Sequence, residues 1–156
     1  MPSVFPKAVI VGGLTDVILS NICGIPFHAY VKQSRGLAEV PIEQLTAAIV
    51  AATQSSFGLS LAQFLIGGLC SILGGYTAAA IAKSDELLNG VLASWLCVGI
   101  GLYAIFSDAF GIPLWQLIVS VVTTPLVYMA GAYLWLRRNR PFMFAPNKSL
   151  ERTRER

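Results

Sequence analysis

Four long apolar segments follow one another along this chain, and the polar and charged residues gather in the intervals between them. The segments cover residues 8–30, 57–82, 87–106 and 113–136. At about 1.5 Å per residue, an α-helix of this length crosses the roughly 30 Å hydrocarbon core of a bilayer. The segments show almost none of the polar face that a helix of a soluble protein carries. The pattern predicts an all-α integral membrane four-helix bundle.

The segments that connect the spans add local structure to this prediction. In the longest one, apolar residues recur at roughly helical spacing after Pro41. This spacing predicts a short amphipathic surface helix at residues 41–54, with an extended stalk on the second span as the alternative. The interval after Lys83 is so short that the second and third spans must form an antiparallel hairpin. Pro26 should kink or end the first span, and Pro125 should kink the fourth.

The charges are distributed unevenly between the two sides of this arrangement. Nine of the eleven lysines and arginines fall on one side, and only Lys32 and Arg35 fall on the other. By the positive-inside rule, both termini are expected in the cytoplasm. The first segment is expected to remain as a membrane anchor and not to be cleaved as a signal peptide, since Asp16 interrupts its apolar stretch.

Composition supports a membrane protein with one compact domain. The chain is 55% apolar and 12% charged, against about 25% charged residues in soluble proteins. Residues 1–136 are predicted to form a single transmembrane domain, and residues 137–156 a basic cytoplasmic tail. The tail is interpreted as a stop-transfer signal followed by disorder, or as a contact with anionic lipid headgroups. Membrane lipid is therefore an expected partner, and nucleic acid is not.

Small residues form two rows along the second span. The first row is Gly67, Ser71, Gly75 and Ala79, and the second is Gly74, Ala78 and Ala82. Helices in lipid associate through close packing of small side chains, because the hydrophobic effect contributes little between them. The two rows predict a central helix packed on two sides, with homodimerisation through the same surface as the alternative.

Asp16 is the one ionisable residue well inside a span. A charge at such a depth costs on the order of 3 kcal/mol and requires a partner, water or a proton. We expect Asp16 to face inward and to bond Ser20 one turn along, or a polar side chain at the same depth. Those candidates are Tyr76, Ser94 and Tyr128. The resulting site is interpreted as a proton or cation site, or as a polar lock for helix packing.

The sequence favours no catalytic or metal chemistry. His28 is the only histidine, and the three cysteines lie singly in three different spans. There is no Ser/His/Asp set and no phosphate-binding loop in a strand–helix context. We therefore expect no enzyme, no metal site and no cofactor.

Two short motifs carry a family resemblance. The first span contains GGLTD at residues 12–16, and the second contains Gly67 followed by GGYTAAAIA at residues 74–82. With these motifs the chain resembles small uncharacterised bacterial four-span membrane proteins that have an aspartate in helix 1 and a GGYxAAxxA-type motif in helix 2. Many of those proteins carry a basic residue within the AAxxA stretch, where this chain has Ala80. The resemblance implies the bacterial inner membrane and brings no established activity.

Two functions are compatible with these features. The leading hypothesis is a non-enzymatic accessory or structural membrane protein that acts through helix–helix association, with itself or within a larger membrane complex. The alternative is an oligomeric channel or transporter for a small ion or solute that uses Asp16.

Overall fold

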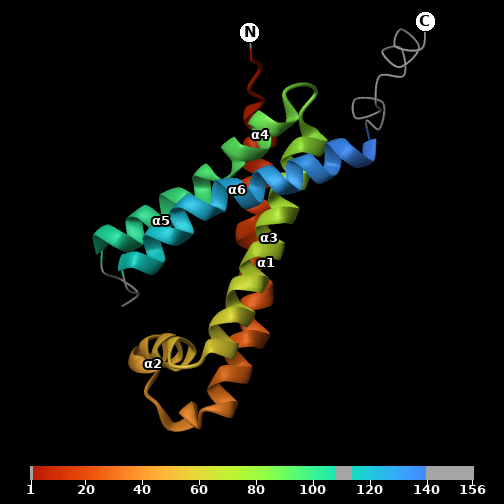
Figure 1. Cartoon of the computed structure of the whole chain (residues 1–156). Helices are drawn as coiled ribbons and strands as arrows, with labels where there is room; N and C mark the ends of the chain where they lie inside the picture. Colours follow the sequence, from red (N-terminus) through yellow and green to blue (C-terminus); the bar gives the residue numbers. More distant parts are fainter. Residues whose placement is uncertain (1, 108–113, 140–156) are drawn as a thin grey trace, which may run out of the picture.

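The computed structural model describes residues 2–107 and 114–139, which form helices and no strand (Figure 1). The helices are α1 (Pro6–Ser34), α2 (Ile42–Gln54), α3 (Phe57–Ile81), α4 (Glu86–Ala93), α5 (Trp95–Ser107) and α6 (Leu114–Asn139), with a short 3-10 turn at Leu37–Glu39. The start of α1 and the end of α6 lie at one end of the molecule, and α2 lies at the opposite end. The predicted turn before α6 and the tail from residue 140 lie outside the described residues.

Four helical stretches are long and apolar enough to cross a membrane: α1, α3, the combined α4–α5 stretch and α6. This confirms the all-helical class and the four predicted spans. By length and composition, the chain therefore has the helices of a multi-pass membrane protein. The predicted surface helix is also confirmed as a helix, since α2 covers Ile42–Gln54. Ser55 and Ser56 separate it from α3.

The first span is longer than predicted. α1 continues through Pro26 to Ser34, so the prediction that the proline could end the helix is wrong. Pro26 lies on an exposed side of α1, where its ring meets no tightly packed neighbour. A membrane helix tolerates such a proline because only one backbone hydrogen bond is lost and the surrounding turns remain bonded.

The third span is interrupted for one residue at Ser94, which keeps right-handed helical angles (φ −66°, ψ −18°), so α4 and α5 together form one membrane-length helical stretch. The Ser94 hydroxyl donates to the carbonyl oxygen of Val91 at 2.7 Å, and its backbone N–H bonds the same carbonyl at 3.0 Å. A serine hydroxyl competes in this way with regular helical bonding. α4 packs against α1, α3 and α6. α5 runs away from α3 and lies beside the first half of α6 (Figure 1).

α3 is packed on two sides, as the rows of small residues predict. A side chain at Gly74 would lie 2.9 Å from the carbonyl oxygen of Gly12 on α1, and one at Gly75 would overlap the carbonyl oxygen of Tyr128 on α6. Ala78 and Ala79 continue this contact and are fully buried. Backbones this close gain many dispersion contacts, which are the main source of stability between membrane helices.

The N-terminal segment is fastened to the turn between α3 and α4 by Asn89, which is fully buried. Its Nδ2 group donates to the carbonyl oxygens of Ser3, Ser84 and Asp85 at 3.0, 3.2 and 3.0 Å. Its Oδ1 atom accepts a 2.7 Å bond from the backbone N–H of Phe5. One side chain thus holds both the tight turn and the entry to α1.

Replacing Asn89 by alanine should therefore loosen this end of the molecule. The Phe5 N–H and the Ser3 carbonyl lose their partner, which costs about 1–3 kcal/mol for each buried group left unsatisfied. We expect a lower thermal unfolding temperature in detergent and faster proteolysis before α1. Asn139→Ala is the control, because its exposed amide bonds the Trp135 carbonyl of its own helix and no other group among the described residues. An equal loss in both variants would contradict this role of Asn89.

Candidate functional site

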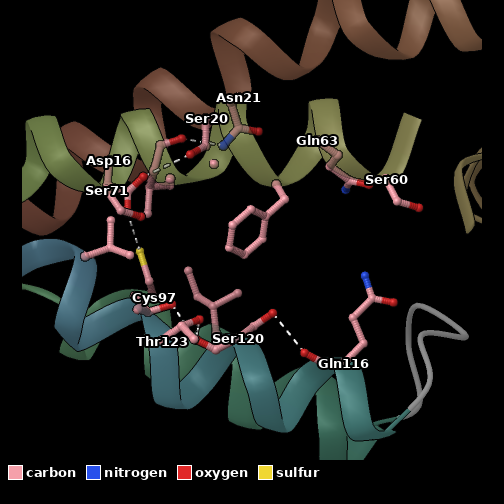
Figure 2. A pocket seen from close by; sticks show the side chains of 17 residues that line it. Asp16, Ser20, Asn21, Ser60, Gln63, Ser71, Cys97, Gln116, Ser120 and Thr123 are labelled. Carbon is pink, nitrogen blue, oxygen red and sulfur yellow. Dashed lines mark hydrogen bonds between the residues drawn. The ribbon is translucent and has the colours of Figure 1, made fainter. Parts of the chain in front are cut away.

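A cavity of about 450 Å³ separates α1 and α3 from α5 and α6 (Figure 2). It lies where α5 and the first half of α6 diverge from the other two helices. We call it the wedge. Its polar lining comprises Asp16, Ser20 and Asn21 of α1, Ser60, Gln63 and Ser71 of α3, Cys97 of α5, and Gln116, Ser120, Thr123 and Thr124 of α6. Such a concentration of polar groups between apolar helices marks a functional site more often than a packing surface.

Asp16 closes the narrow end of the wedge and is only 3% exposed. Its Oδ1 atom accepts a 2.9 Å hydrogen bond from the Ser20 hydroxyl. Its Oδ2 atom accepts a 2.8 Å bond from the Ser71 hydroxyl and a 3.3 Å contact from the Cys97 thiol. All three groups donate to the carboxyl oxygens of Asp16, so both oxygens have hydrogen-bond partners within the protein.

The network extends from Cys97 into the core of the bundle. The Cys97 sulfur lies 3.5 Å from the hydroxyl oxygen of Tyr128, which is fully buried. Groups from α1, α3, α5 and α6 therefore meet in one layer around Asp16. Beyond this layer Gly75 and Tyr128 are in backbone contact, so the wedge ends here.

The wide end of the wedge faces α2. Figure 2 shows Gln63 and Ser60 on α3 opposite Gln116 on α6. The same three residues line a smaller cavity of about 40 Å³ together with Thr53 and other residues of α2. A 2.9 Å bond from the Ser60 hydroxyl to the Thr53 carbonyl holds α2 beside this opening. A solute entering here would pass α2 before it reaches Asp16.

The hydroxyls of α6 are oriented by their own helix. Ser120 donates to the carbonyl of Gln116 at 2.9 Å, and Thr124 donates to that of Ser120 at 2.7 Å. Each hydroxyl has used its one donor, but its oxygen retains lone pairs that can accept a bond. This side of the wedge therefore offers acceptors to a ligand that brings N–H or O–H groups.

The electrostatics of the wedge are one-sided. Among the described residues that line it, Asp16 is the single acidic group, and none is a lysine, an arginine or a histidine. In a low-dielectric setting an uncompensated carboxylate attracts a cation strongly. No group of three or more histidine, cysteine or acidic residues occurs among the described residues, so the wedge lacks an all-protein metal cage there.

Comparison with protein-family models, curated proteins and solved structures finds no match to this chain. The resemblance to small bacterial membrane proteins thus stays a prediction, and the wedge must be interpreted from its own geometry.

The structure brings together some of the residues singled out in the sequence. Asp16 faces inward and bonds Ser20, as expected, and Tyr128 joins it through Cys97. Tyr76 does not reach this network, because it faces a different groove between α3 and α6. Ser94 does not reach it either, since its hydroxyl bonds its own helix backbone.

Two residues predicted to serve helix packing have other positions. Ser71 belongs to the small row of α3, but its hydroxyl bonds Asp16. Gly67 lines the wedge, and a side chain built on it would meet no atom within 4 Å. The packed part of the row therefore begins only after the helices converge beyond Gly67.

The polar residues at the wide end of the wedge were not predicted from the sequence. Their signal is a polar residue every third or fourth position within an apolar helix. Gln116, Ser120 and Thr124 follow this spacing on α6, and on α3 it is followed by Gln63 and Ser71 with the small residue Gly67 between them. Residues four apart lie on one helix face, so each set forms a stripe that faces the wedge.

Proposed function

We propose that this chain is a membrane protein that binds a small cation in the wedge and forms part of a channel or transporter. The observation that carries the proposal is the unbalanced Asp16 carboxylate at the end of a polar cavity inside the membrane-spanning helices. Intramembrane carboxylates of this kind occur on ion and substrate pathways. The hydroxyl and amide oxygens along the wedge add acceptors for a cation that carries N–H groups.

In a single chain, the wedge is open at one end and closed at the other. The wedge opens toward α2 and stops at the layer formed by Asp16, Ser71 and Cys97. Passage through the membrane would require this layer to open or a second copy to complete the path, which agrees with an oligomeric channel or transporter. We further propose a bacterial inner-membrane location with cytoplasmic termini, on the charge asymmetry and the resemblance described above.

Helix association with a partner is the second candidate function. The small residues Gly74, Gly75 and Ala79 are already used inside the chain, so they are not free to bind a partner. Gly68 on α3 and Gly99 on α5, in contrast, have no atom within 4 Å of an added side chain. Open glycines of this kind permit close approach of another helix.

Cysteine labelling in native membranes separates these functions. A cysteine at Ser120 faces the wedge, whereas one at Val122 lies on the exposed face of the same helix. We expect Ser120→Cys to react with a small cationic methanethiosulfonate reagent at least about tenfold faster than with its anionic counterpart, because Asp16 attracts the cation. Adducts are counted by intact mass, with the native cysteines measured in the wild-type chain.

Val122→Cys is the matched control and should react slowly with both charged reagents. Equal rates with both reagents at Ser120→Cys would contradict a cation-selective wedge. Protection of Ser120→Cys in native membranes, lost after purification, would instead favour a partner helix in the wedge.

A further inference from the structure

A second cavity, independent of the wedge and of the proposed function, lies on another face of the molecule. It has a volume of about 500 Å³ and lies between α3 and α6 near the end of α6. Its lining consists of Ile72, Leu73, Tyr76, Leu134, Arg137 and Arg138. Polar and charged groups stand at one end of this groove, and aliphatic side chains form the rest.

The polar end of the groove is basic. Arg137 and Arg138 occupy the last turn of α6, at the end of the molecule that also holds the start of α1 and the turn between α3 and α4 (Figure 1). No hydrogen bond or ion pair joins either guanidinium group, or the Tyr76 hydroxyl, to another residue in the part of the chain that the structure describes. Three donor groups at one site therefore remain available to an external acceptor.

The apolar part extends toward the middle of the membrane. Leu73 lies eight residues before the end of α3 at Ile81, which corresponds to about 12 Å along the helix axis. Leu73 and Leu134 are both about half exposed, at 49% and 47%, so an acyl chain can lie against them. The groove thus combines a basic rim at a helix end with an apolar floor running into the bilayer.

We infer that this groove binds one anionic phospholipid. The phosphate would accept hydrogen bonds from Arg137, Arg138 and Tyr76, and an acyl chain would cover Leu73 and Leu134. Arginine suits this task because its planar guanidinium donates two parallel bonds to phosphate oxygens. Basic pockets between membrane helices bind anionic lipid headgroups by the same chemistry. A free phosphate would leave the aliphatic floor uncovered, so the lipid is the better match.

The test is native mass spectrometry of the full chain taken from mixed micelles with equal parts phosphatidylglycerol and phosphatidylcholine. We expect the wild-type chain to retain one phosphatidylglycerol in preference to phosphatidylcholine. The double variant R137Q/R138Q should bind it at least about tenfold more weakly, since two charge-assisted contacts are lost. R137K/R138K keeps the charge but not the paired bonds, and it should lie between the two.

The control K7Q/K83Q removes the same number of charges from the same end of the molecule, outside the groove. It should bind phosphatidylglycerol like the wild-type chain, and glycerol phosphate should not displace the lipid. Equal weakening in K7Q/K83Q and R137Q/R138Q would overturn the proposal, because attraction would then be diffuse. Displacement by glycerol phosphate would overturn it in favour of a site for free phosphate.

Discussion

Replacing Gly75 by alanine is expected to prevent the normal packing of α3 against α6. An added side chain at Gly75 would overlap the carbonyl oxygen of Tyr128, and one at Gly131 would overlap the carbonyl oxygen of Ile72. Both obstacles are backbone atoms, so neither can move away without displacing a whole helix. We expect a loss of about 3 kcal/mol or more for either variant, at the upper end of overpacking costs.

Gly67 and Gly68 provide the control on the same helix. A side chain at either position meets no atom within 4 Å, and alanine favours a helix over glycine by about 1 kcal/mol. Gly67→Ala should therefore leave stability unchanged or raise it. Thermal unfolding in detergent and the yield of folded protein measure both effects. Normal stability of Gly75→Ala would contradict the close contact between α3 and α6.

The second large effect is expected at Asp16, where stability and binding should respond differently. In Asp16→Asn the amide oxygen still accepts one hydrogen bond, and the amide nitrogen can donate to the Ser71 hydroxyl. We expect a stability loss of only about 1 kcal/mol, as is typical of hydrogen bonds between membrane helices. Cation binding should fall about 10- to 100-fold, because a bond to a charged group contributes about 1.5–3 kcal/mol.

Asp85→Asn is the matched control for charge. Asp85 is exposed in the turn before α4, where its carboxylate accepts a 2.8 Å bond from the backbone N–H of Ser3. The variant loses the same charge as Asp16→Asn, but far from the wedge. It should bind a cation like the wild-type chain. If Asp16 were only a polar lock, Asp16→Asn would lower stability modestly and no cation would bind to either form.

The sequence predicted the spans well because hydropathy depends on composition along the chain. It also predicted that α3 is packed on two sides, because small residues at every fourth position allow neighbouring helices to approach closely in lipid. It did not predict the interruption at Ser94, because a single serine hydroxyl can bond its own backbone within an apolar helix without ending it.

The polar site was predicted in part. The depth of a residue in the membrane follows from its position along the span, but the direction in which a helix face points does not. Tyr76 was one of three candidate partners of Asp16, beside Ser94 and Tyr128, chosen on the basis of depth alone. It lies five residues from Ser71, about 140° around α3, and so faces the groove beside α6. Gly67 was expected to pack, but its neighbours separate where the wedge begins. Both positions depend on the relative placement of the helices, which the sequence of a single helix does not determine.

The most direct test of the account is equilibrium binding of radiolabelled guanidinium to the full chain in lipid nanodiscs. Guanidinium is always charged, and its N–H groups match the carboxylate and the hydroxyl oxygens of the wedge. We expect saturable binding of one guanidinium per chain in the wild type and in Asp85→Asn, and binding at least about tenfold weaker in Asp16→Asn. Absence of saturable binding to the wild-type chain, or equal binding to Asp16→Asn, would contradict the proposed cation site.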